Sequence, residues 1–202
     1  MEHLSFLKVY ISVYFALYIL LSFALPSWRV FKKAGINPIT FGKTDNAHDY
    51  IGLQMKVFTA LLAAAILVYS FYPVGYPYLM PLAYIMKPIT FWIGMAFMHL
   101  SLLWIIIAQY QMGQSWRIGI DEANKTELKQ VGFFSLSRNP IFLGMLVSLL
   151  GIFLVLPNIV TAVCMFSSYL LIQIQVRLEE DFLLNQHGTA YSAYKNKVRR
   201  WL

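Results

Sequence analysis

Charged side chains are sparse along this chain, and they divide it into long apolar stretches. A helix rises ~1.5 Å per residue, so about 20 residues cross a hydrocarbon core ~30 Å thick. Three stretches in the first half meet that length, and each is bounded by lysine or arginine. We therefore predict membrane-spanning helices over residues 9–28, 57–73 and 89–111.

A fourth apolar stretch, Ile141 to Val176, carries no charged side chain. As one helix it would be nearly twice as long as the hydrocarbon core is thick. The Pro157-Asn158 pair near its middle favours a turn. The pattern therefore predicts a helical hairpin with spans over 141–156 and 159–176. The residues that flank the hairpin, Arg138 and Glu180, are then expected at the same membrane face.

The composition supports an integral membrane protein, because 59% of the residues are apolar and only 12% are charged. We expect one all-α domain over residues 1–202, with five spans, a C-terminal helical hairpin and a cytoplasmic helical tail. The last span should continue to Gly188, and Thr189 is a plausible N-cap for a short final helix. Residues 29–54 are expected to form an ordered loop, and the run 79–86 is too short to span.

The distribution of basic residues predicts the orientation. With five spans, all but two of the 16 lysines and arginines fall on one side of the membrane, and the exceptions are Lys8 and Lys87. Basic loops favour the cytoplasm, so the hairpin feet should be cytoplasmic and the N-terminus outside. The bacterial inner membrane or the endoplasmic reticulum would suit such a protein. The excess positive charge favours anionic lipids as partners rather than nucleic acid.

Two rows of side chains at helical spacing are candidates for chemistry. Gln173, Arg177 and Glu180 share one helix face, although an emerging helix with a surface ion pair explains them equally well. Trp104 and Gln111 belong to the second row, for which close helix packing is the alternative. No histidine or cysteine has metal-ligand spacing, so no metal is expected.

Two segments, residues 132–144 and 179–200, carry a resemblance to a known family. Residues 132–144 read Gly-Phe-Phe-Ser-Leu-Ser-Arg-Asn-Pro-Ile-Phe-Leu-Gly, and they resemble the element G-x-Y…R-H-P-x-Y-x-G of the isoprenylcysteine carboxyl methyltransferase and phospholipid methyltransferase superfamily. Residues 179–200 resemble its ending E-E-x-x-L-x-x-x-F-G-x-x-Y-x-x-Y-x-x-x-V-x-R. The resemblance covers residues 111–202, the expected catalytic half.

This resemblance implies an enzyme that uses S-adenosyl-L-methionine. By analogy Arg138 would meet the cofactor carboxylate, and Glu180 its amino group or positive sulfur. The cofactor-binding residues that the resemblance implies are Gly132, Phe133, Arg138, Asn139, Pro140, Gly144, Glu179, Glu180, Tyr191 and Tyr194. The expected catalytic residues are Arg177 and Glu180, and the expected acceptor-binding residues are Trp104, Gln111 and Arg177.

The acceptor should be small and lipidic or lipid-attached. The leading expectation is a prenylcysteine-like carboxylate, which could pair with Arg177. The alternative is a phospholipid or other amine, which Glu180 could deprotonate. Sterol reductases have a related C-terminal half, and a non-catalytic membrane scaffold or transport component is a further alternative. The chain departs from the family pattern at Asn139, where relatives have histidine. Asparagine forms hydrogen bonds but does not titrate.

Overall fold

The computed structural model describes residues 2–41 and 46–202, and the regular structure of these residues is helical, with two isolated β-bridges in the connecting segments. Four helical segments are long and apolar enough to cross a membrane, namely Phe6–Ala34, Ala47–Phe71, Pro88–Ser115 and Ile159–His187. A fifth apolar helix, Pro140–Val155, is shorter. The all-α membrane fold is therefore confirmed, while the number of five crossings stays a prediction.

The first long helix consists of α1 (Glu2–Ile19), a π-helical turn η1 (Leu20–Ala24) and α2 (Leu25–Ala34). Pro26 has no backbone N–H, so the carbonyl of Ser22 loses the helical donor it would otherwise have. The side chain of Gln109 replaces that donor, because its Nε2 donates to the Ser22 carbonyl at 2.6 Å. The bulge thus fixes the first helix against α4.

The expected loop over 29–54 is wrong in extent, because helices occupy both of its ends. Helix α2 continues to Ala34, and α3 (Ala47–Phe71) begins well before the predicted span. Asn46 caps α3 by accepting a hydrogen bond from the backbone N–H of Asp49 at 2.9 Å. Lysine and arginine end an apolar run but are good helix formers, so the helices extend beyond the charges.

The predicted hairpin is present. Helix α5 (Pro140–Val155) and helix α6 (Ile159–His187) are antiparallel and joined at Asn158, which is fully buried and caps α6 through Thr161. Short helix α7 (Thr189–Lys197) follows, and its N-cap is Gly188 rather than the expected Thr189. The connection after α3 contains η2 (Tyr76–Leu79) and contacts the hairpin turn, because Leu82 N–H donates to the Pro157 carbonyl at 3.0 Å.

Helix α4 (Pro88–Met112, extended by η3, Gly113–Ser115) packs closely along α5. A Cβ on Gly151 would lie 2.9 Å from the backbone oxygen of Gly94, so neither position has room for a side chain. One buried hydrogen bond of 2.6 Å joins Ser101 to Ser148. Small and hydroxyl residues at such contacts are typical of membrane helix pairs.

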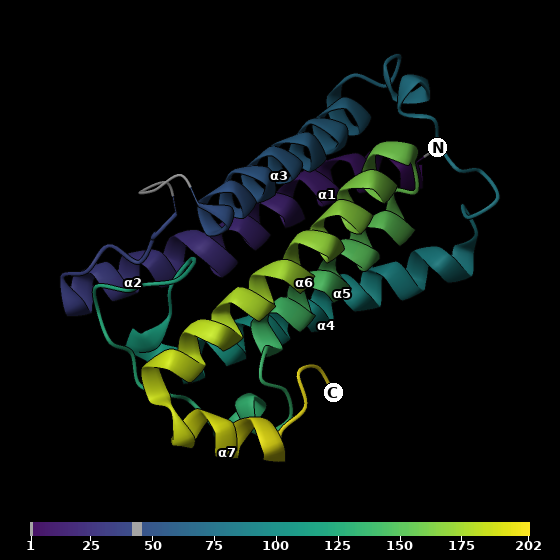
Figure 1. Ribbon diagram of the computed structural model, residues 1–202. Coiled ribbons are helices and arrows are strands. Elements are labelled where there is room, and N and C mark those ends of the chain that lie inside the picture. Colours follow the sequence, from purple (N-terminus) through teal and green to yellow (C-terminus); the bar gives the residue numbers. More distant parts are fainter. Residues whose placement is uncertain (1, 42–45) are drawn as a thin grey trace.

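Figure 1 shows α1 and α3 side by side and α4, α5 and α6 packed together, with α3 contacting α6 between the two groups. The short α7 lies across the end of the bundle where α6 stops. The start of α1 and the C-terminus lie at opposite ends of the bundle (Figure 1). The fold therefore gathers η4 (Gly132–Ser135), the start of α5, the end of α6 and α7 at one end.

Candidate functional site

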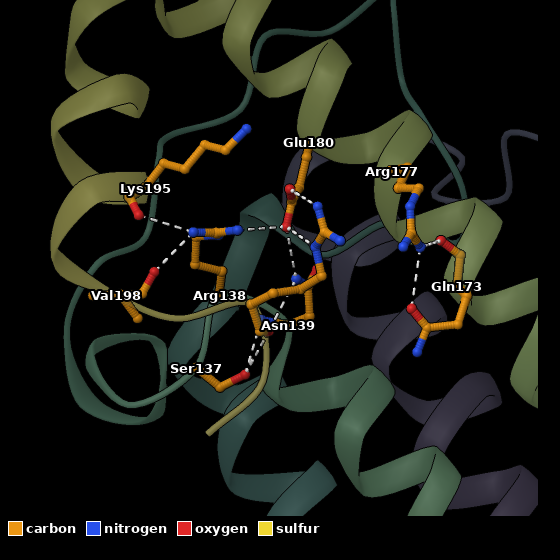
Figure 2. A network of polar contacts seen from close by, with 9 residues as sticks. Ser137, Arg138, Asn139, Gln173, Arg177, Glu180, Lys195 and Val198 are labelled. Carbon is orange, nitrogen blue, oxygen red and sulfur yellow. Dashed lines mark hydrogen bonds and ion pairs between the residues drawn. The ribbon is translucent and has the colours of Figure 1, made fainter.

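A buried ion-pair cluster joins the two feet of the hairpin (Figure 2). Glu180 is 4% exposed, and its Oε1 accepts a hydrogen bond from Arg138 Nη2 at 3.0 Å. Arg200 binds both oxygens of the same carboxylate, through Nε at 2.9 Å and Nη2 at 2.8 Å. The structure thus brings together Arg138 and Glu180, as the charge-free hairpin predicted, and adds a second guanidinium.

Arg138 also ties the C-terminal segment over this cluster. Its Nη1 donates to the carbonyls of Lys195 and Val198 at 2.9 and 2.8 Å, and its backbone N–H donates to the Arg199 carbonyl at 3.0 Å. Its Nε is buried and has no hydrogen-bond partner. Two guanidiniums therefore share one carboxylate, and the cluster carries a positive charge that an anionic group can satisfy.

Asn139 lies beside the cluster as a neutral donor. Its Nδ2 is 3.4 Å from Glu180 Oε1 and 3.3 Å from the carbonyl of Arg200, and its backbone N–H donates to Ser137 Oγ. A neutral histidine would offer one ring N–H at this position, whereas the amide offers two donors from one nitrogen. Pro140 then begins α5, a position where its missing N–H costs nothing.

Two tyrosines of α7 hold that helix against the site. The hydroxyl of Tyr194 donates to the carbonyl of Phe134 at 2.5 Å, and Tyr191 is fully buried beside it. Burial raises the pKa of Tyr194 to about 12, so its hydroxyl remains a donor at neutral pH. Both tyrosines, which the resemblance implied as cofactor-binding residues, therefore lie beside the ion-pair cluster as neutral side chains.

Trp104 and Gln111 hold η4 and the start of α5 in place. Trp104 stacks on Phe133, with ring centroids 3.9 Å apart, and its Nε1 donates to the carbonyl of Pro140 at 2.8 Å. Gln111 Oε1 accepts from the backbone N–H of Phe133 at 2.8 Å. Gly144 faces the same helix, because a Cβ there would lie 2.5 Å from Ile105 Cγ1. The contacts of all these residues lie between α4 and the hairpin.

A cavity of about 620 Å³ lies on the other side of the hairpin, between α1, α3, α5 and α6. That volume is within the range of small-molecule sites. Its polar end includes Arg138 and Asn139, and segments 116–119 and 126–129 also line it. Its apolar part is lined by Phe15, Tyr18, Ile19, Phe58, Leu149 and Ile152.

The predicted site residues divide around this cavity. Five of them line it, namely Arg138, Asn139, Pro140, Glu179 and Tyr194. The others lie outside its lining, namely Trp104, Gln111, Gly132, Phe133, Gly144, Arg177, Glu180 and Tyr191. Arg177 is exposed, and its Nη1 donates to the backbone and side-chain oxygens of Gln173 on the same helix (Figure 2).

Sequence reasoning missed two residues at the site. Arg200 was noticed only as the last residue of the resemblance, and its return to Glu180 depends on the turn into α7. Gln175 is 1% exposed and lines the cavity, where its Nε2 donates to Glu179 Oε1 at 2.8 Å. The Oε1 of Gln175 has no partner. Buried polar atoms are nearly always paired, so Gln175 Oε1 and Arg138 Nε are two exceptions among the residues that line the cavity.

The segments over the cavity come from both halves of the chain. Thr40 N–H donates to the carbonyl of Ile118 at 3.1 Å, and Ile118 N–H donates to the carbonyl of Pro38 at 2.8 Å. An ion pair of 2.7 Å between Arg117 and Asp121 fixes the following turn. Burial opposes ionisation of Asp121, but hydrogen bonds from Arg117 and Asn124 outweigh it and hold the pKa of Asp121 below its usual value.

The described residues contain no group of three or more histidine, cysteine, aspartate or glutamate side chains that could hold a metal ion. The polar groups that line the cavity instead include guanidiniums, lysine amines, amides and the two carboxylates of Glu127 and Glu179. These groups can bind and orient a charged small molecule.

Comparison with known families finds one match. The family model of phospholipid methyltransferase matches residues 89–190, which extend from the start of α4 into α7 and include the hairpin, Arg138, Asn139 and Glu180. Arg200 lies beyond the matched range. No curated protein and no solved structure matches the chain significantly. Because the family model covers half of the chain, the protein belongs to the phospholipid methyltransferase family, a family of membrane methyltransferases.

Proposed function

We propose that the protein transfers a methyl group from S-adenosyl-L-methionine to a lipidic or lipid-attached small acceptor. The observation that carries this proposal is the cavity, which joins an apolar part among the membrane helices to a polar end with orphaned hydrogen-bonding atoms. An amphiphilic acceptor needs both parts, and a charged cofactor needs the polar one.

The residues at the polar end fit the cofactor. The unpaired Nε of Arg138 and the net positive charge of its cluster suit the cofactor carboxylate. Asn139 and Tyr194 line the same end, while Glu180 orients both arginines. The cofactor supplies a methyl group on a positively charged sulfur, and the protein must align it and exclude water.

The remaining residues that the resemblance implies would not contact the cofactor, but would hold in place the helices that form the site. Gly132, Phe133 and Gly144 fix η4 and α5 against α4, and Tyr191 packs under α7. Trp104 and Gln111 would affect the acceptor only indirectly, because they hold η4 and the start of α5 in place.

A prenylcysteine-like carboxylate is one acceptor class, and an amine such as a phospholipid headgroup is the other. The carboxylate is favoured by Lys56, which lines the cavity and has no hydrogen bond or ion pair with the described residues. Arg177, expected to meet that carboxylate, would act only at the outer surface, because it lies outside the cavity lining. The amine is favoured by Glu179, a carboxylate in the cavity wall.

We place the polar end of the cavity on the cytoplasmic side of a bacterial inner membrane or of the endoplasmic reticulum. The support is the clustering of basic residues in the segments at this end of the bundle, since basic loops favour the cytoplasm. Metabolic S-adenosyl-L-methionine would be accessible there.

Calorimetry with S-adenosylhomocysteine tests the cofactor. The purified wild-type protein should bind it, whereas Arg138→Ala and Glu180→Ala should each lose binding. His99→Ala is the control, because His99 bonds to Tyr10 at 2.7 Å and lies outside the cavity lining. A wild-type protein that shows no binding at millimolar ligand would falsify the proposal.

Radiolabelled methyl transfer tests the acceptor class. A prenylcysteine analogue and phosphatidylethanolamine are offered separately, in mixed micelles, to the protein with labelled cofactor. We expect one of them to be methylated, and label in neither would exclude both acceptor classes.

A further inference from the structure

His48, the second residue of α3, holds a connecting segment against the wall of the cavity. We infer that it is a positioning residue: its neutral ring fastens residues 116–120 to the start of α3, and protonation of the ring releases them. This regulation of the site rests on the proposed function and deepens it. His48 lies outside the cavity lining, so it acts through the segments that it holds.

The hydrogen bond to Ile120 determines which nitrogen of the ring carries the proton. A backbone N–H can only donate, and the N–H of Ile120 lies 2.9 Å from His48 Nε2. Nε2 is therefore the unprotonated nitrogen, and Nδ1 bears the hydrogen of the neutral ring. Nδ1 faces the carboxylate of Asp49, whose Oδ1 is 3.5 Å away. The bond to Ile120 thus requires the neutral ring.

The ring of His48 is enclosed by close contacts with both connecting segments. The ring of Phe41 stacks on it, with centroids 4.3 Å apart, and Phe41 also packs on Gly52, one turn further along α3. Gly119 has φ +96°, and a Cβ on it would lie 2.8 Å from His48 Nε2. Only 11% of the His48 side chain is exposed. The shape and the acceptor of this side chain therefore fix how the two segments meet α3.

The two segments that His48 holds form part of the cavity wall. An isolated bridge between Ile39 and Ile118 pairs their backbones. The wall residues that they supply are Ile39, Phe41, Trp116, Arg117, Ile118 and Gly119. Arg138 lies in the same wall, at the polar end where we place the cofactor. A loosened segment would admit water there, and water weakens the attraction between a guanidinium and a charged ligand.

Protonation changes His48 Nε2 from an acceptor into a donor. Its new N–H would face the N–H of Ile120, and two buried donors without an acceptor are costly. The carboxylates that act on the ring are Asp49 on α3 and Glu122 in the segment after Ile120. Both favour the protonated ring, whereas burial opposes it. The wall is therefore closed at neutral pH and loosens in acid, when the ring takes up a proton.

The test compares His48→Leu with His48→Gln. Leucine packs on Phe41 but has no acceptor, whereas glutamine offers an oxygen that accepts and does not titrate. At neutral pH, calorimetry should show that S-adenosylhomocysteine binds His48→Leu at least about fivefold more weakly than the wild type, because a buried N–H loses its partner. His48→Gln should restore the affinity to within about twofold. His99→Leu is the matched control and should bind as the wild type does, because His99 lies outside the cavity lining.

The pH dependence of the same affinity tests the release. Between about pH 8 and 5, where histidines titrate, the affinity of the wild type should fall relative to that of His48→Gln, toward the value for His48→Leu. The ratio of wild type to His48→Gln removes the contributions of the other titrating groups, which both proteins share. A ratio that stays constant with pH would overturn the inference, as would equal affinities of His48→Leu and the wild type.

Hydrogen–deuterium exchange of the ligand-free protein tests the bond to Ile120 directly. Residues 116–121 should exchange faster in His48→Leu than in the wild type or His48→Gln, while α4 and α5 keep their protection, which shows that the variant is folded. Equal exchange of this segment in all three proteins would overturn the inference alone. A wild-type protein that binds no S-adenosylhomocysteine would instead remove the proposed function, whatever the exchange shows.

Discussion

At the residue scale, the candidate site depends on how one buried carboxylate is neutralised. A buried charge needs a partner, and Glu180 has two arginines that come from opposite sides of it in the sequence. The pairing with Arg138 could be predicted, because the apolar hairpin returns the chain to the membrane face that it left. The pairing with Arg200 could not, since it depends on α7 turning back across the end of α6. Neither could the orphaned oxygen of Gln175, because a missing partner becomes visible only when the neighbours are placed.

Arg200→Ala should weaken the protein and its cofactor site together. Glu180 would lose a bidentate partner but keep Arg138 and Asn139, so we expect a loss of about 2 kcal/mol in the free energy of unfolding. The Arg138 guanidinium would also lose the neighbour that shares Glu180 with it, and the affinity for S-adenosylhomocysteine should fall. Thermal unfolding in detergent and calorimetry measure the two effects.

Arg199→Ala is the matched control for this prediction. Arg199 is the neighbouring arginine, but its side chain is exposed, so stability and affinity should both stay near the wild-type values. Equal losses in the two variants would mean that the tail acts through its overall charge rather than through the bond to Glu180.

At the element scale, the sequence located the helices but left open whether one face of α4 binds a ligand or packs against other helices. Trp104 and Gln111 were expected at the acceptor, because polar side chains at helical spacing suit a binding face. The same spacing suits a packing face, and both residues bond to the segment around η4 and the start of α5. Hydrophobic and polar patterns do not distinguish the two cases, since each requires small and hydrogen-bonding residues on one stripe.

Gly132→Ala should disturb this packing and thereby the site. Gly132 has φ +65°, and a Cβ would lie 2.5 Å from the side chain of Gln111, whose Oε1 binds Phe133 N–H. The left-handed backbone costs an alanine about 1–2 kcal/mol, and loss of the Gln111 bond adds about 1 kcal/mol. Gly35→Ala is the matched variant, because Gly35 has φ +67° and no atom within 4 Å of the added Cβ. In unfolding experiments Gly132→Ala should be the less stable variant, and equal stability of the two would contradict the role of Gln111.

At the scale of the whole molecule, the N-terminal helices are needed to complete the cavity. The family match begins at α4, yet α1 and α3 supply much of the apolar lining. The sequence predicted these helices as spans but attributed the site to Trp104 and to residues 111–202. A cavity wall formed by packing between distant helices leaves no local motif, which is why α1 and α3 received no role in the site.

The topology of the whole chain is the last prediction, and cysteine labelling tests it. Cys164 is the only cysteine, so Cys164→Ser gives a background for single cysteines at Tyr78, Gln130, Ile159 and Asn196, all of which are exposed. If α5 and α6 both cross the membrane, cysteines at positions 130 and 196 should react with an impermeant maleimide only from the cytoplasmic side. Cysteines at positions 78 and 159 should react only from the other side. Labelling of the cysteine at position 159 from the cytoplasmic side would show that the 16-residue α5 does not cross. Labelling of the cysteines at positions 130 and 196 from opposite sides would mean that α6 crosses without α5. The 3.0 Å contact between Arg138 and Glu180 requires both residues at the same aqueous face. They lie there only if the chain between them crosses the membrane an even number of times.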